Sequence, residues 1–490
     1  MKVRFIDQTL RDGQQSLWGL RMRPFQAAPA LPHLDATGFH TIDLTGPGMF
    51  TILLRTYKED PWAATDFLVA GLPGNKLRTA TRTNSVGVMG FSPDSVVDLW
   101  INCAARHGIG SFWIFDCLFD MPRMKRVCDV VRAAGAEPTP CVMYGLTDVH
   151  TDEFFADRAR EMAGWEGVPS IELEDAPGVL KVDRARTLLP AVKAACGDVP
   201  LEIHSHNTTG EATRMYIEAI EAGIDIIHTC SWPLANGPSN PSTEAMVANI
   251  EVMGHEHDLD VSRLAPVADH FREIAETAGP GFELGIPTEY TLAPYEHQLP
   301  GGMTGSLKKQ LADHGMEDRL QEVLEEIPRV RRELGQPIMA TPFSQFVGIQ
   351  ALLNVIGEER YGLVPDEVIQ YALGQYGPLM RPVDADVMDK IMAAERAPHF
   401  EKWEPPQPTL EELRARFGRK ISDEELLLRV LWSTEEVDAM LANGPIRTDP
   451  RTSASEIVEN IRDLIAEAGD VSRIAVSQPG MSIKLSRNGG

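Results

Sequence analysis

Short apolar segments alternate with amphipathic helical segments over about the first 300 residues, and this alternation most constrains the fold. The apolar segments that we expect to be strands are residues 3–7, 40–45, 111–116, 137–144, 170–175, 201–206 and 224–230. The clearest helical segments between them are residues 95–108, 124–135, 185–197 and 211–223. Strand–helix units of about 30 residues are typical of parallel strands joined by right-handed crossovers. Seven or eight such units predict an α/β fold, a TIM (β/α)8 barrel. A doubly wound open sheet is the alternative, but no G-x-G-x-x-G motif follows the first strand.

The pattern changes after about residue 300, where helical periodicity dominates. A chain of 490 residues exceeds the size of one ordinary core, so we expect more than one domain. We predict a TIM-barrel catalytic domain over residues 1–300 and a mostly helical C-terminal domain over 301–445. Residues 446–490 are predicted to be a polar linker and a small αββ appendage, whose two strands are joined at QPG.

Composition excludes several classes of function. A formal charge of −25 disfavours nucleic acid and anionic membranes as partners. Six scattered cysteines without a C-x-x-C pair indicate a reduced, cytoplasmic protein rather than a disulfide framework. The N-terminus lacks the apolar core of a signal peptide, and no stretch of about 18 apolar residues occurs.

The segment IELEDAPG (171–178) places two glutamates on one face of a predicted strand. Side chains two residues apart on a strand point the same way, so Glu172 and Glu174 share a face. Buried carboxylates are costly unless a positive group meets them. The sequence therefore predicts a cation beside them.

Two histidines on the next strand offer that cation a set of ligands. His204 and His206 lie two apart in LEIHSHN, at a strand end, which is how two imidazoles reach one metal. Two hydrogen-bonded histidines at the barrel rim are the simpler interpretation of this pair alone. With Asp12 from RDGQQS and Glu174, the set suits a divalent Zn, Mn or Co ion.

The polar segment TLRDGQQS (9–16) is expected to form a loop after the first strand. A surface turn is its simplest interpretation. Its functional interpretation places Arg11 and Gln15 as catalytic donors to a developing oxyanion, beside Asp12 on the metal.

Several segments together resemble a known family of enzymes. They include RDGQQSL (11–17), IHSHNTTG (203–210), LPGGM (299–303) and TPFSQFVGIQALLNVIGEERY (341–361). These resemble the carboxyltransferase domains and subunits of pyruvate carboxylase, oxaloacetate decarboxylase (alpha) and transcarboxylase (5S), within the DRE-TIM metallolyase superfamily. The resemblance covers roughly residues 1–430.

The resemblance implies a carboxyltransferase that moves CO₂ from carboxybiotin to the enolate of a ketone or 2-oxo acid at a divalent metal. Because no A-M-K-M motif is present, biotin is expected on a partner subunit. Biotin carboxylase and biotin carrier subunits are the implied partners, and a homodimer within a larger complex is the implied assembly. The tail resembles the start of bacterial biotin carrier proteins, so it is a candidate docking element.

The chain also departs from the family pattern at its site. The family's carbamylated lysine, a metal ligand, aligns with Glu174, and its proton-shuttling threonine aligns with Pro238. Ser239 is the nearest substitute for that hydroxyl. Arg82 lies one position from the family's substrate-binding arginine. These departures favour an acceptor other than pyruvate, and they leave a biotin-independent DRE-TIM lyase or decarboxylase and a non-catalytic assembly scaffold as alternatives.

Overall fold

The computed structural model describes residues 1–87, 90–287, 292–301, 303–304, 307, 311–312, 315–449, 473–478 and 481–486. The chain divides into two compact units, Met1–Ile446 and Arg447–Gly490. The first unit contains both the predicted barrel and the predicted helical region. The boundary predicted near residue 300 is therefore a boundary between types of structure within one unit.

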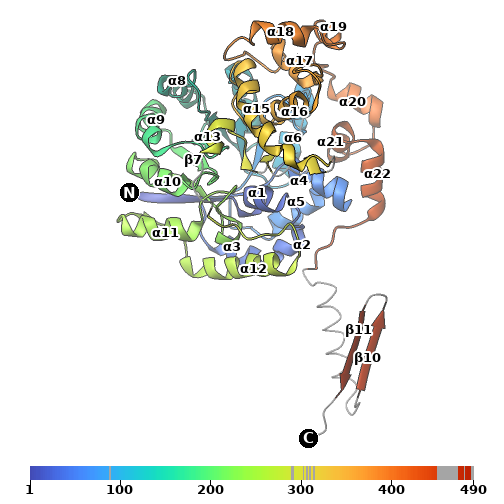
Figure 1. Cartoon of the computed structure of the whole chain (residues 1–490). Helices are drawn as coiled ribbons and strands as arrows, with labels where there is room; N and C mark the ends of the chain where they lie inside the picture. The colour runs from blue at the N-terminus through green and yellow to red at the C-terminus, as the bar shows by residue number, and fades with distance from the viewer. Residues whose placement is uncertain are drawn as a thin grey trace. The chain divides into compact units, whose positions relative to one another are not determined.

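Eight parallel strands close into the predicted TIM barrel (Figure 1). These strands are β1 (Lys2–Asp7), β2 (Thr41–Thr45), β3 (Leu77–Arg82), β4 (Ser111–Phe115), β5 (Glu137–Met143), β6 (Ile171–Asp175), β7 (Leu201–Ser205) and β8 (Ile226–Thr229). Closure is made by β1, which pairs with β8 on one side and with β2 on the other. A two-residue strand, β9 (Glu256–His257), pairs in parallel with the N-terminal end of β1.

Helices cover the outside of the barrel (Figure 1). They include α3 (Leu31–Ala36), α5 (Pro61–Ala70), α6 (Asp94–Arg106), α7 (Met121–Ala133), α8 (Asp152–Ala163), α9 (Val182–Cys196), α10 (Ala212–Glu221), α11 (Thr243–Val252) and α12 (Leu264–Thr277). Short helices lie among them: α1 (Gln14–Trp18), α2 (Pro24–Ala27), α4 (Pro47–Ile52) and α13 (Ala293–His297). Local sequence sets their ends. For example, Thr151 caps α8 by accepting a hydrogen bond from the Phe154 amide at 3.2 Å.

Strand β3 was absent from the predicted strands. Its sequence, LRTATR, carries two arginines four residues apart, Arg78 and Arg82, whereas the parallel strands of a closed barrel are usually apolar. Arg78 points into the barrel, where it meets the carboxylate of Glu202 from β7. The carboxylate that compensates Arg78 reaches it only in the closed barrel. The sequence pattern of β3 alone therefore could not identify it as a strand.

Helices dominate the region after the barrel, as predicted. They are α15 (Leu320–Glu333), α16 (Phe343–Ile356), α17 (Asp366–Ala372), α18 (Ala385–Met392), α19 (Ala397–Phe400), α20 (Leu410–Phe417), α21 (Asp423–Leu431) and α22 (Thr434–Asn443). Arg106 at the end of α6 joins barrel and helical region, because its Nη2 atom lies 3.1 Å from Asp423 and 2.7 Å from Glu424. Among the described helices, none has the length and apolar character needed to span a bilayer.

The second unit contains an antiparallel hairpin. Strands β10 (Arg473–Gln478) and β11 (Met481–Ser486) pair from Arg473↔Ser486 to Gln478↔Met481. The two strands predicted around QPG are therefore present. The helix predicted before them lies outside the described residues.

Candidate metal and acceptor site

A cavity of about 270 Å³ opens at the carboxyl ends of the barrel strands. Active sites of TIM barrels are built at this end. Its polar lining includes Arg11, Gln15, Arg82, Glu174 and His206. Aromatic and aliphatic side chains line the rest, among them Trp113, Phe115 and Met143.

The segment after β1 is helical and buried, so the prediction of a loop there was wrong. Thr9–Gly13 forms a π-helical turn that continues into α1, and the five residues of the turn are buried. Gly13 allows this close packing: a Cβ there would lie 3.0 Å from both Cys230 Sγ and the Leu234 carbonyl oxygen. Pairing of Arg11 with buried carboxylates offsets the cost of burying its charge. The turn fixes Asp12 at the edge of the cavity.

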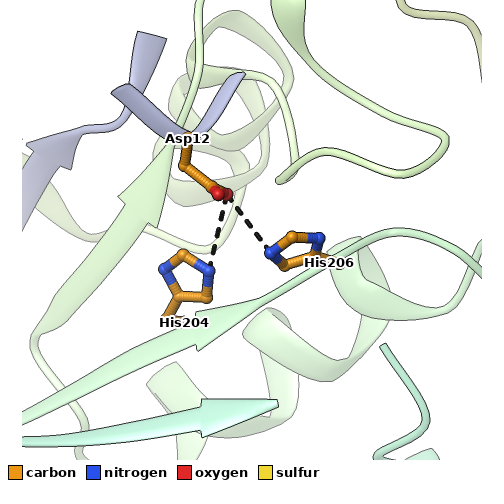
Figure 2. Close-up of side chains that lie close together, drawn as sticks. All are labelled: Asp12, His204 and His206. Atoms are coloured by element: carbon orange, nitrogen blue, oxygen red, sulfur yellow. Dashed lines mark ion pairs between the residues drawn. The ribbon is translucent and has the colours of Figure 1, made fainter. Parts of the chain in front are cut away.

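Three of the four predicted metal ligands come together (Figure 2). Asp12 Oδ2 lies 3.2 Å from His206 Nε2 and 3.7 Å from His204 Nε2. Zinc bonds to nitrogen and oxygen are about 2.0–2.2 Å, so two ligands of one ion can lie up to roughly 4 Å apart. Among the residues that the structure describes, Asp12 Oδ2 is buried and has no hydrogen-bond partner. The spacing and this unsatisfied oxygen both fit a divalent cation.

Neighbouring groups orient both imidazoles. His206 Nδ1 lies 2.6 Å from the Pro238 carbonyl oxygen, which can only accept, so Nδ1 carries the proton. His204 Nδ1 lies 3.1 Å from His228 Nδ1. In both histidines Nε2 is therefore the atom that faces Asp12. A backbone or side-chain partner on the far nitrogen is the arrangement usual for metal-ligating histidines.

Electrostatics around Asp12 favour a cation between these groups. Burial opposes ionisation of Asp12, but His206 and Arg11 outweigh it and hold the pKa of Asp12 below its ordinary range. Burial lowers the pKa of His206, and the charge of Asp12 more than offsets this, so that its pKa is raised. Burial holds the pKa of His204 well below its ordinary value. The negative charge of Asp12 thus stabilises a positive charge beside it, which can be a protonated His206 or a metal ion.

Glu174 lines the same cavity but stands apart from the Asp12 group. Among the described residues, its carboxylate groups with Cys141 and Glu172, and Cys141 Sγ lies 3.7 Å from its Oε2 atom. Burial raises the pKa of Glu174 to about 7, with Arg11 and His206 opposing the rise. Because glutamate is shorter than a carbamylated lysine, its oxygens reach less far from β6. Direct ligation by Glu174 stays a prediction.

Arg11 and Gln15 both line the cavity, and their role as catalytic donors stays a prediction. Arg11 is held firmly: its Nη1 donates to Asp12 Oδ1 at 3.0 Å and its Nε to Asp43 Oδ2 at 2.8 Å. Its guanidinium carbon lies 5.4 Å from the centre of the Trp113 ring. Gln15 lies on α1, one residue past the start of that helix.

Arg82 ends β3 and also lines the cavity. Its Nη2 donates to Ser85 Oγ at 3.0 Å and to the Gly87 carbonyl oxygen. Burial lowers the pKa of Arg82 to about 10. It remains a cation at neutral pH, which suits a site for a carboxylate.

Ser239 does not occupy the position expected of a catalytic hydroxyl. Its side chain is fully buried, and its Oγ donates to the Leu234 carbonyl oxygen at 2.7 Å. That bond stabilises the turn that carries Pro238, and it directs the Ser239 hydroxyl to the backbone of this turn. The replacement of the family's threonine by Ser239 stays a prediction, and in this structure the Ser239 hydroxyl is directed to the Leu234 carbonyl oxygen.

A buried charge network below the site was missed by sequence reasoning. Arg78 donates to Glu202 at 2.6 and 3.0 Å and lies 3.6 Å from Glu172. The cation predicted for Glu172 is thus an arginine from β3. Burial and the charge of Glu174 raise the pKa of Glu172 well above its ordinary value, and Arg78 opposes that rise. Glu202 lies two residues before His204 on β7 and therefore points to the same face of the strand. This spacing in the sequence could have identified Glu202 as a neighbour of the site.

Two family models match the chain. The model described as "Conserved carboxylase domain" matches residues 295–462, and the model described as "HMGL-like" matches residues 119–270. The first covers most of the helical region and the second covers part of the barrel. The matches agree with the resemblance found in the sequence.

Individual proteins are similar over most of the chain. A pyruvate carboxylase subunit of Methanocaldococcus jannaschii is 34% identical over 80% of this chain and 68% of its own length. The 2-oxoglutarate carboxylase large subunit of Hydrogenobacter thermophilus is 30% identical over 94% of this chain and 71% of its own length. The carboxyl transferase domain of Rhizobium etli pyruvate carboxylase has a similar fold, with a TM-score of 0.80, 23% identity, and coverage of 100% of this chain and 84% of that chain.

Proposed function

This chain belongs to the family of carboxyltransferase subunits of biotin-dependent carboxylases, and we propose that its acceptor is a 2-oxo acid or ketone bound in the barrel cavity. The observation that carries the proposal is the grouping of Asp12, His204 and His206 beside that cavity, within a fold shared with carboxyltransferases. The relatives differ in the acceptor that their names give, pyruvate or 2-oxoglutarate. Sequence identity alone therefore does not choose the acceptor.

The cavity supplies groups for both ends of such an acceptor. We propose that Arg82, a buried cation, holds a carboxylate, and that Gln15 and Arg11 donate to the oxygen on which enolate charge develops. Trp113, Phe115 and Met143 would contact the carbon skeleton and exclude water. In the transfer, the α-carbon of the acceptor loses a proton to give the enolate. The bond from the carboxyl carbon to the biotin nitrogen breaks, a bond from that carbon to the enolate carbon forms, and the proton ends on the biotin nitrogen.

A divalent ion is proposed at Asp12, His204 and His206. As a Lewis acid it would polarise the acceptor carbonyl. Zn, Mn and Co all suit a donor set of one carboxylate and two imidazoles. The proposed contribution of Glu174 is a fourth ligand, an oxygen that binds directly or through a water molecule. It lines the same cavity, and the charges of Arg11 and His206 favour its ionised form.

The proposal also covers the partner subunits of the chain and its cellular compartment. We infer that carboxybiotin is delivered by separate biotin carboxylase and biotin carrier subunits, since the relatives are named as subunits of carboxylases. A homodimer within a cytoplasmic complex and a docking role for residues 446–490 are part of the same proposal. All six cysteines are buried and free of disulfides, which fits a reducing compartment.

Purification from the native host tests the proposal. We expect a biotinylated subunit to co-purify with this chain, and about one metal ion per chain on the same sample. The purified complex should carboxylate a 2-oxo acid or ketone in a manner dependent on ATP and bicarbonate. Metal without a biotinylated partner would favour a biotin-independent lyase instead, and absence of both would favour a scaffold.

The Glu174→Ala variant tests the fourth ligand. If Glu174 binds the ion, the variant should lose metal and carboxylation together. Retention of full metal content would show that Glu174 is no ligand. The Ser239→Ala variant is the matched control, because Ser239 is buried behind the site; it should retain the metal.

A further inference from the structure

A chain of hydrogen bonds connects His204 to a buried carboxylate at the centre of the barrel. His204 Nδ1 lies 3.1 Å from His228 Nδ1, and His228 Nε2 lies 3.0 Å from Glu202 Oε2. All three side chains are buried inside the barrel, His204 and Glu202 from β7 and His228 from β8. The positions of the protons along this chain can be assigned from the groups at its end.

Glu202 can only accept. Its Oε1 receives hydrogen bonds from Arg78 Nη2 at 3.0 Å and Ser170 Oγ at 2.5 Å. Its Oε2 receives Arg78 Nη1 at 2.6 Å, besides the contact with His228 Nε2. The paired hydrogen bonds from the Arg78 guanidinium to both oxygens keep Glu202 ionised, so it has no proton to donate. His228 Nε2 must therefore carry a proton and donate it to Glu202.

Gln8 gives an independent assignment of the same ring. Arg11 Nη2 donates to Gln8 Oε1 at 3.0 Å, and arginine cannot accept, so the amide orientation of Gln8 is fixed. Gln8 Nε2 then lies 3.0 Å from His228 Nδ1 and must donate to it. His228 Nδ1 is thus an unprotonated acceptor, in agreement with the protonated Nε2 deduced from Glu202.

The unprotonated Nδ1 of His228 determines which nitrogen of His204 carries the proton. Two unprotonated nitrogens 3.1 Å apart would repel each other, so His204 Nδ1 must carry a proton and share the acceptor of His228 with Gln8. His204 Nε2 is then left with its lone pair. Asn240 Nδ2, 3.3 Å away, can donate to that lone pair, and Asp12 Oδ2 lies 3.7 Å away.

We propose that His228 is a positioning residue that, anchored by Glu202, holds His204 in the Nδ1-protonated tautomer and so prepares Nε2 to bind the metal. His228 is outside the proposed ligand set of Asp12, His204 and His206, and it is not among the residues that line the cavity. Its role rests on the proposed metal site, because the benefit of the fixed tautomer is metal affinity. Outer partners of metal-ligating histidines typically contribute 10–100-fold to affinity.

Nitrogen-15 NMR of histidine-labelled, metal-free protein tests the tautomer directly. The His204 ring signals are assigned by their loss in His204→Gln. We expect a protonated Nδ1 and an unprotonated Nε2. A protonated Nε2 on His204 in the wild-type protein would overturn the proposal. This measurement needs no variant of His228 and no bound metal.

Zinc affinity, measured by competition with a chromophoric chelator, tests the consequence. His228→Leu removes the acceptor and should weaken zinc binding about 10–100-fold. His228→Asn keeps an acceptor near the position of Nδ1 and should recover most of that loss. Ser170→Ala, which removes a donor to Glu202 without touching His204, is the matched control and should bind zinc as the wild type does.

The outcomes separate this proposal from the proposed function. Equal zinc affinity in wild type, His228→Leu and His228→Asn would overturn the positioning role even though the metal site stands. If the wild-type chain binds no zinc or manganese, the proposed metal site fails, and the NMR measurement still decides the tautomer. Should His228→Leu fail to fold, the NMR result on the wild-type protein decides alone.

Discussion

Replacing Arg78 with methionine should destabilise the barrel strongly at neutral pH. Arg78 donates two hydrogen bonds to Glu202, at 2.6 and 3.0 Å, and its side chain is 3% exposed. Methionine fills similar space but leaves Glu202 without its cation. The carboxylate would keep only the contacts from Ser170 and His228.

The size of the effect follows from the number and kind of the lost bonds. Two charge-assisted hydrogen bonds at about 1.5–3 kcal/mol each give about 3–6 kcal/mol, and breaking one partner of a buried pair typically costs about 3–5 kcal/mol. Unfolding entropy of about 2.1 cal/mol/K per residue, taken over Met1–Ile446, is roughly 0.9 kcal/mol/K. We therefore expect Tm to fall by roughly 3–5 °C at pH 7.

The pH dependence has a definite sign. Burial alone would raise the pKa of Glu202, but Arg78 and the bond from His228 hold it well below its ordinary value. The stability that Glu202 contributes in the wild type is therefore present above the unfolded pKa and lost as the pH falls. In the variant, burial without Arg78 raises the pKa of Glu202, so stability falls as the pH rises. The difference in Tm should thus be larger at pH 7 than at pH 4.5.

Differential scanning calorimetry of both proteins at the two pH values checks this reasoning. The double variant Arg78→Met/Glu202→Gln removes the unpaired charge and should recover part of the lost Tm. An equal loss of Tm at pH 7 and pH 4.5, with no recovery in the double variant, would refute the charge-pair explanation. The loss would then reflect packing alone.

Three further predictions concern other parts of the unit. Burial raises the pKa of Asp7 from 3.8 to about 7, so the free energy of unfolding falls as the pH rises between these values. Over the whole range this pKa shift corresponds to about 4 kcal/mol. In Asp7→Asn the free energy of urea unfolding should therefore decline less from pH 5 to pH 7 than in the wild type. His206→Asn should lose the bound metal while its circular dichroism stays that of the wild type, whereas full metal content in the folded variant would remove His206 from the ligand set. Phe50→Ala should cost about 3–5 kcal/mol, measured by urea unfolding, because Phe50 is 1% exposed and packs 4.8 Å from Trp62 and 5.1 Å from Trp100 between ring centroids; a cost below about 1 kcal/mol would contradict that packing.

Much of the fold could be predicted because its signals are local. Repeated strand and helix periodicity predicted the closed parallel barrel and the helical region that follows it. The exception among the strands, β3, carries Arg78 and Arg82, whose charges are compensated by groups far away in the sequence. The helical turn at Asp12 was also missed, because polar residues in TLRDGQQS are buried only through contacts with other strands.

The candidate site was predicted in part, for a similar reason. Asp12, His204 and His206 could be recognised by residue type, strand position and family resemblance, and they meet in space. Ser239 was chosen by adjacency to Pro238, and adjacency does not fix the direction of a hydroxyl in a turn. Glu174 lines the cavity, but its role as a ligand depends on how far its side chain reaches, which is a three-dimensional property.

By itself the sequence determined the barrel, the family and the chemical types gathered at the carboxyl ends of the strands, since periodicity and motifs are properties of neighbouring residues. Only the tertiary structure decided the partners of the buried charges. Glu172 and Glu174, two residues apart on one strand face, meet different surroundings: the first lies against Arg78, and the second borders the cavity beside Arg11. Coulomb energies inside a protein depend steeply on distance and burial, and both are set by strands that the chain order leaves far apart.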